Sequence, residues 1–156
     1  MKRKISERGQ SLVEFGISLV VILLLLAGTV ELGIALFQFI QLRDAAQEGA
    51  LYGSICPDAA DITTRVRNAS SSPIDLTVTS GDDAVTVVVQ GRQGATDTVK
   101  SLNTLAAGDG IYVEVSYNHQ VFMPFASLFV SGNTIPITAS VTNTVLDNNL
   151  SKAACQ

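Results

Sequence analysis

The sequence predicts an α+β fold, in which a long amino-terminal helix packs on a small, mostly antiparallel β-sheet of about four strands. Three patterns carry this prediction. Residues 15–30 contain no charged side chain and are mostly Leu, Val and Ile. Apolar and small residues then recur at helical spacing to about residue 52. Later segments alternate apolar and polar residues, as half-buried strands do.

The charges of the chain are unevenly distributed along its 156 residues, a length that suffices for one domain and a membrane helix. The formal net charge is −4, but residues 1–9 carry +3, so the remaining residues carry −7. A basic tip before an apolar helix and an acidic body after it indicate a cytoplasmic tip and a body outside the cytoplasm. Because no cluster of Lys and Arg marks the body, we do not expect the chain to bind nucleic acid.

The helix is expected to run unbroken from about Ser11 to about Tyr52, which is about 60 Å. That length is about twice the thickness of a bilayer core. We therefore expect residues 11–33 to span the membrane and residues 34–53 to project beyond it as an amphipathic half. Helical spacing predicts one packed face, formed by Ile34, Phe37, Ile40, Leu42, Ala45, Ala46, Gly49, Ala50 and Gly53. This face should meet either the sheet of the same chain or the helix of a neighbour.

Two acids lie at the limits of the apolar stretch. Glu14 stands near its cytoplasmic edge, where a lone carboxylate buried in lipid costs about 2–3 kcal/mol, so its presence calls for a functional reason. Glu31 follows 17 residues later, about 26 Å along the helix and near the outer interface. We interpret Glu31 as a solvated acid at the level of the lipid headgroups and not as an assembly contact.

A β-rich head domain outside the cytoplasm is predicted over residues 54–156. It begins with a short helix around Ile62 and Val66, which lie on one side. Ile74–Ser80 and Ala84–Gly91 alternate apolar and polar residues around a Gly-Asp-Asp turn. This arrangement predicts a β-hairpin.

The second half of the head is predicted to contain two further strands. Residues 91–110 are polar and glycine-punctuated, which indicates a long exposed connection with one helical turn near residues 99–105. The strand Ile111–Phe122 follows, then the apolar segment Met123–Gly132, then the final strand Thr134–Leu146. We expect the amphipathic half of the long helix to cover the apolar face of the sheet.

The chain lacks the residue sets that common enzymes and cofactor sites require. Its only histidine, His119, lies on a predicted strand, and we interpret it as an exposed strand residue. No Cys and His cluster at zinc-ligand spacing and no glycine-rich phosphate-binding motif occurs. We therefore expect neither an enzyme nor a bound cofactor or metal.

Two cysteines, Cys56 and Cys155, lie far apart in the sequence. In a body outside the cytoplasm they are predicted to form one disulfide, closing a loop of about 100 residues. Such a bond stabilises by about 4–5 kcal/mol in the chain-entropy model. The alternative is two separate thiols, buried or free.

The segment from Arg8 to Phe15 resembles a known processing signal. Its string RGQSLVEF, preceded by basic residues and followed by an apolar run, is similar to the prepilin signal of type IV pilins. It resembles most the TadE-type pilins of tight-adherence (Tad/Flp) systems, as do VELG and RDAAQEGA further along the helix. The resemblance implies that residues 1–9 are a leader, which a membrane aspartyl peptidase removes by cutting between Gly9 and Gln10. Gln10 stands where many type IV pilins have an aromatic residue.

The same resemblance implies a structural subunit, a pilin or pseudopilin, of a type IV pilus of the Tad branch that serves surface adhesion. The implied partners are copies of itself or other pilins, the prepilin peptidase and the inner-membrane assembly machinery. Before assembly the chain would be a single-pass membrane protein with a cytoplasmic amino terminus, and after assembly part of an extracellular fibre. There Glu14 would pair with the new amino terminus at Gln10 of a neighbouring subunit, which neutralises both charges.

Two other interpretations fit parts of the sequence. In the first, the chain is an ordinary secreted protein whose apolar start is a cleaved signal peptide, although its apolar stretch is long and Ala27-Gly28-Thr29 is a poor cleavage site. In the second, it is a single-span anchored binding domain that keeps its leader and does not polymerise. The start of the mature chain separates the three: Gln10 for the pilin, a residue near 30 for the secreted protein, and Met1 for the anchored domain.

Overall fold

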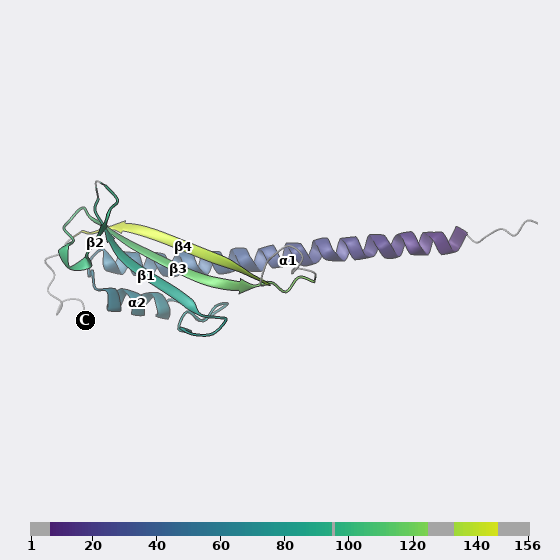
Figure 1. Cartoon of the computed structure of the whole chain (residues 1–156), viewed down its shortest axis with the longest axis horizontal. Coiled ribbons are helices and arrows are strands. Elements are labelled where there is room, and N and C mark those ends of the chain that lie inside the picture. The colour runs from purple at the N-terminus through teal and green to yellow at the C-terminus, as the bar shows by residue number, and fades with distance from the viewer. Residues whose placement is uncertain (1–6, 95, 125–132, 147–156) are drawn as a thin grey trace, which may run out of the picture.

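The computed structural model describes residues 7–94, 96–124 and 133–146 of the chain. Its longest element is helix α1, Glu7–Gly53, whose 47 residues make it about 70 Å long. The amino-terminal half of α1 extends away from the rest of the molecule, and its other half lies along the sheet (Figure 1). The predicted unbroken helix is confirmed, and it begins one turn before Ser11.

The head contains one sheet of four antiparallel strands in the order β2-β1-β3-β4. The elements after α1 are α2 (Ala59–Asn68), β1 (Val85–Arg92), β2 (Val99–Lys100), the 3₁₀ turn η1 (Leu102–Thr104), β3 (Gly110–Gln120) and β4 (Thr134–Thr144). A long helix on a four-stranded antiparallel sheet confirms the predicted α+β class.

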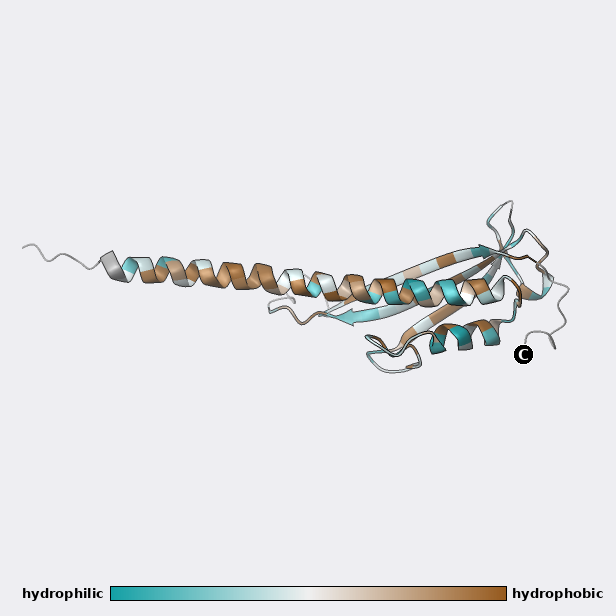
Figure 2. Cartoon of the chain, turned by 180° about the vertical axis from the view of Figure 1, so that it is seen from behind, coloured by the Kyte–Doolittle hydropathy of each residue, from teal (hydrophilic) through white to brown (hydrophobic). Residues whose placement is uncertain are grey.

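Both helices lie on the same face of the sheet, so the head has two layers (Figure 1, Figure 2). β3 is the central strand, paired with β4 along its whole length and with β1 over eight positions. Its alternate residues Ile111, Val113 and Val115 are fully buried under the helices. Ile62 and Val66 of α2 are also fully buried, and the start of this helix is capped by the Asp58 side chain. The predicted alternation in β3 and the predicted packing side of α2 are confirmed.

The part of α1 that meets the sheet is lined with small residues. Ala45, Ala46 and Ala50 are buried. A Cβ added at Gly53 would lie 2.8 Å from Ile62 Cδ1 and 2.9 Å from Ile111 Cγ2. A larger residue here would hold α1 away from α2 and β3. Of the two partners expected for this face, the structure shows the sheet of the same chain.

The predicted packed face of α1 is wrong towards its amino-terminal end. Ile34, Phe37 and Ile40 were expected on it but are 39%, 61% and 52% exposed. The face that packs continues instead from Leu42 to Gln38, one turn earlier, and Gln38 is buried. The large apolar residues in this stretch therefore mark the uncovered side of the helix.

The predicted hairpin is also wrong, because residues 74–80 form no strand. Ile74 and Leu76 are buried at alternate positions, but side chains take the place of a neighbouring strand. Gln41 Nε2 donates to the Ile74 carbonyl at 2.7 Å, and the Ile74 N–H donates to Gln41 Oε1 at 2.9 Å. Arg67 Nη1 donates to the Leu76 carbonyl at 2.8 Å. The fourth strand is instead β2, which lies in the segment predicted as a connection, beside the helical turn η1 expected there.

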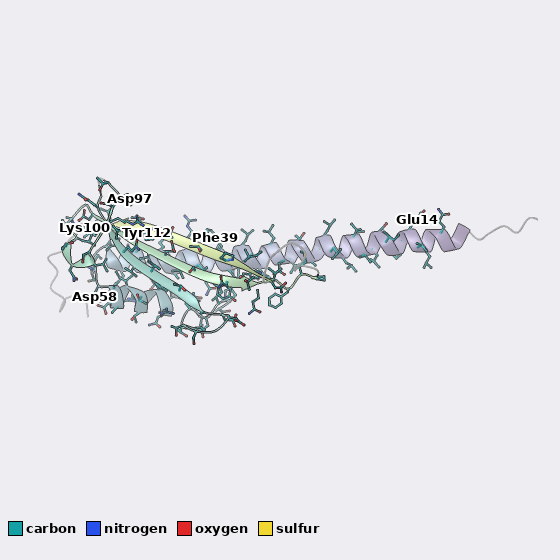
Figure 3. The ribbon with its side chains drawn as sticks, in the orientation of Figure 1. Glu14, Phe39, Asp58, Asp97, Lys100 and Tyr112 are labelled. Carbon is teal, nitrogen blue, oxygen red and sulfur yellow. The ribbon has the colours of Figure 1, made fainter. Side chains whose placement is uncertain are left out.

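Asp109 ties together loops at the end of the sheet farthest from the free half of α1, where Figure 3 labels Lys100 and Tyr112. Lys100 Nζ donates to Asp109 Oδ2 at 2.6 Å, and the Ala106 N–H donates to the same oxygen at 2.8 Å. The bond from Lys100, and after it the bond from Ala106, lowers the pKa of Asp109.

Gly49→Ala is expected to destabilise the head by about 1–3 kcal/mol, because the new Cβ overlaps Cγ2 of the stiff Val66 side chain. Urea unfolding of the full chain in detergent, followed by near-ultraviolet circular dichroism, measures the change. Gly33→Ala is the matched control, since nothing lies near its Cβ position and Ala favours the helix. Wild-type stability of Gly49→Ala would contradict the close packing described above.

Asp109→Asn is expected to make the head less stable at neutral pH and less sensitive to acid. Because the pKa of Asp109 is lower in the folded state, its contribution is complete above the unfolded value of about 4 and is lost as pH falls through the folded value. Urea midpoints measured between about pH 6 and pH 2.5 should fall less steeply in the variant than in the wild type. Identical pH profiles would contradict a role for this carboxylate.

Candidate functional site

The amino-terminal half of α1 presents apolar side chains on all sides. This helix is long and apolar enough to cross a membrane. Its large apolar residues are uncovered: Leu12 is 73% exposed and Leu25 is 68% exposed. Figure 2 shows the apolar colouring continuing around this free half. An apolar surface of this size is typical of a segment that is solvated by lipid or covered by other helices.

The predicted processing and assembly residues lie at the start of this free half. Gly9 is exposed, and nothing lies within 4 Å of its Cβ position. Gln10 and Glu14 occupy successive turns on one side of the helix, and Gln10 Nε2 donates to Glu14 Oε1 at 3.2 Å. Glu14 is exposed and far from the head (Figure 3). The three residues predicted at this site are therefore neighbours on one accessible helix end.

A second polar site joins α1 to the end of β3, and here the sequence predictions were wrong. The His119 side chain is 1% exposed, not exposed as expected, and the Glu31 side chain is 14% exposed, much less than expected of a solvated acid. His119 Nε2 donates to Glu31 Oε1 at 2.6 Å. The Phe122 N–H lies 3.2 Å from each oxygen of the same carboxylate. Glu31 thus receives hydrogen bonds from a side chain and from the backbone of the head.

The regular periods of the two elements bring Glu31 and His119 together. Along β3, every second residue from Ile111 faces the helices, and His119 is the fifth member of that series. Along α1, Glu31 lies seven and eleven residues before Gln38 and Leu42 and therefore on the packed face. Extending both series would have predicted the contact; the expectation that polar residues are exposed prevented this.

The chain continues past this contact and follows α1 towards its free half. Met123 Sδ lies 3.5 Å from the position that a Cβ would take at Gly28. Gly28 belongs to the uncharged stretch of residues 15–30, so the end of the head overlaps the apolar half of the helix. Phe122, which precedes Met123, is 75% exposed. Most of the apolar segment predicted at 123–132 lies outside the described residues.

The remaining predicted site residues lie elsewhere. Cys56 is buried just after α1 and before α2. Cys155 lies outside the described residues, so the disulfide stays a prediction. Within the parts of the chain that the structure describes, no three His, Cys, Asp or Glu side chains are close enough together to hold a metal ion.

Comparison with protein-family models gives a match that covers almost all of α1. The model of the TadE family, described as TadE-like protein, matches residues 9–51. This confirms the resemblance drawn from the helix sequence. Comparison with curated proteins and with solved structures found no match.

Glu31→Ala and His119→Ala are each expected to destabilise the packing of the head on α1 by about 1–3 kcal/mol, because each leaves a buried polar partner unpaired. The double variant should lose less than the sum of the two. Urea unfolding of the full chain in detergent gives the three values, with the exposed acid Glu48→Ala as the control. Additive losses would show that the two side chains do not interact.

Proposed function

We propose that this chain is a structural subunit, a pilin or pseudopilin, of a Tad-type pilus, processed after Gly9 and assembled through α1 for surface adhesion. The observation that carries the proposal is a TadE-like helix whose apolar half projects from a folded head with its side chains uncovered. Such a half-helix suits two environments in turn, the bilayer before assembly and neighbouring helices afterwards. The role is structural and not enzymatic.

In the membrane state, α1 crosses the bilayer as a single span over residues 11–33, whose middle is the uncharged stretch from Phe15 to Val30. The basic residues 1–9 keep the amino terminus in the cytoplasm, and the acidic head lies outside. About 20 helical residues cross the hydrocarbon core. The 16 residues between Glu14 and Glu31 are fewer than this, so the two carboxylates lie near the edges of the core.

Processing by the prepilin peptidase would cut between Gly9 and Gln10. This bond lies in the first turn of α1, where few helical hydrogen bonds hold the backbone. Glycine favours the helix least of all residues except proline, so Gly9 eases the opening of this turn to the extended form that a peptidase binds. The open space around Gly9 leaves the bond accessible.

After the cut, Gln10 carries a charged α-amino group close to an acid. In the uncut chain, Glu14 accepts a hydrogen bond only from the Gln10 side chain at the exposed end of the helix, among the contacts the structure describes. In a fibre, where neighbouring α1 helices exclude water, the carboxylate of one subunit and the amino group of the next would neutralise each other. A buried charge that loses its partner costs about 3–5 kcal/mol, so the pair makes assembly depend on correct processing.

The second half of α1 contributes the second set of contacts in this proposal. Phe37 and Ile40 are uncovered on this part of α1, beyond the predicted span. Other copies or other pilins of the fibre, together with the inner-membrane assembly machinery, are the partners that we propose for this surface. A disulfide between Cys56 and Cys155 would link the start of the head to the end of the chain after export.

Glu14→Ala and Glu14→Leu are expected to leave membrane insertion intact and to block incorporation into filaments. Removing the carboxylate leaves the neighbour's amino group unpaired in the helical core, at a cost of about 3–5 kcal/mol per contact. Immunoblots of membranes and of filaments sheared from cells measure the two pools. Ser11→Ala, which removes a polar group without changing charge, is the control. Normal filament levels of the Glu14 variants would contradict the proposed pairing.

The start of the mature chain tests the proposed function itself. Intact mass and amino-terminal sequencing of the chain from cells with the peptidase should give Gln10 as the first residue, and from cells without it Met1. Alkylation before and after reduction, read in the same spectra, tests the disulfide. An uncut chain in both strains would favour an anchored, non-polymerising domain, and a start near residue 30 a secreted protein.

A further inference from the structure

We propose that the end of the head formed by Phe122 and Met123 inserts into the outer leaflet of the bilayer beside the spanning helix, so that the unassembled subunit holds its head against the membrane. This inference rests on the proposed membrane-lodged state of α1. It assigns a lipid partner to a surface of the head, in addition to the span.

The depth of this surface follows from its contacts with α1. Met123 packs at Gly28, three residues before Glu31 and therefore about 4.5 Å nearer to the middle of the apolar stretch. If the hydrocarbon core takes up about 20 residues from residue 11 onwards, Gly28 lies inside it. A side chain that touches Gly28 from the head must then lie among the lipid chains as well.

The exposed side chains at this end are apolar. Phe122 is 75% exposed, the highest value among the large apolar residues that the structure describes in the head. Ile135 of β4 is the pairing partner of His119 at the same end of the sheet and is 41% exposed. On α1, Leu32 next to Glu31 is 62% exposed. These side chains extend the apolar surface of the span onto the head, which places them against the same lipid.

Several polar groups at this end are satisfied internally, as contact with lipid requires. The Phe122 N–H and His119 Nε2 donate to the Glu31 carboxylate. The Val121 N–H donates to the Asn133 carbonyl at 2.9 Å, and Asn133 Nδ2 donates to the Val121 carbonyl at 2.9 Å. The contact therefore satisfies polar groups on both elements. The head donates hydrogen bonds to an acid at the edge of the span, and the acid accepts from a backbone N–H that would find no acceptor among lipid chains.

Two acids beside this end of β3 limit how far the tip inserts. Asp82 lies with Asn118 and Gln120 in a polar hollow of about 480 Å³ on the sheet. Asp83 accepts a hydrogen bond from Tyr117, two residues before His119 on β3. These acids must remain among headgroups and water. Insertion is therefore confined to the side chains at the tip and is expected in zwitterionic lipid without help from anionic headgroups.

The natural absence of Trp gives a direct test of this contact. Phe122→Trp is placed, as the full uncut chain, in nanodiscs of phosphatidylcholine at one chain per disc, so that no second copy can cover the tip. Leu25→Trp in the span is the reference for lipid contact. Val99→Trp on β2, exposed at the far end of the head, is the reference for water. Bromination of the lipid acyl chains quenches only a Trp that touches them.

We expect the emission of Phe122→Trp to be blue-shifted relative to Val99→Trp and quenched by brominated lipid to nearly the extent of Leu25→Trp. Adding Glu31→Gln to Phe122→Trp should reduce the quenching, because the tip loses one of the two acceptor oxygens that hold it on α1. A Phe122→Trp that behaves as Val99→Trp does, with Leu25→Trp quenched, overturns this inference alone. If Leu25→Trp is not quenched, the proposed membrane span is contradicted, and the proposed function is contradicted with it.

Discussion

Close packing of small side chains holds the two layers of the head together. Ala46, Gly49, Ala50 and Gly53 bring the backbone of α1 near the β-branched residues of β3 and near α2, so that valine and isoleucine side chains fill the space between them. Because the contact is made by an extended stripe along the helix, the direction of α1 relative to the sheet is fixed. The free half of the same rigid helix is thereby aimed away from the head, and its length sets how far the head stands from Glu14.

The contact between Glu31 and His119 lies at the boundary between the two halves of α1. On one side of it the helix is uncovered except where Met123 meets Gly28, and on the other side one face of the helix is buried against the sheet. Its partners come from both layers, and the head supplies hydrogen bonds to a carboxylate that would otherwise stand unpaired at the edge of an apolar helix. This contact fixes the position of the head along α1. Moving the head along the helix would leave the acid, the histidine and a backbone N–H without partners.

Most of the architecture follows from local patterns. The unbroken helix, α2, and the strands β1, β3 and β4 were all predictable, because periods of 3.6 and 2 residues are properties of the local sequence. The segment at Ile74 shows the limit of this reasoning. It alternates like a strand, but its backbone is paired by the Gln41 side chain, 33 residues away, and no local pattern can report such a partner. β2 was missed for the matching reason, since its two residues form a strand only by pairing with β1.

The sequence by itself determined the long helix, the apolar half with its TadE-like signal, and the residues at which processing and assembly are proposed. These depend on composition, order and spacing along one element, which need no tertiary contact to be recognised. The tertiary structure alone decided which side of the second half is covered and that the Gln41 side chain pairs the backbone at Ile74. Both outcomes depend on the fit between elements far apart in the chain. There, small residues and paired polar groups were buried, and large apolar residues such as Phe37 were left outside.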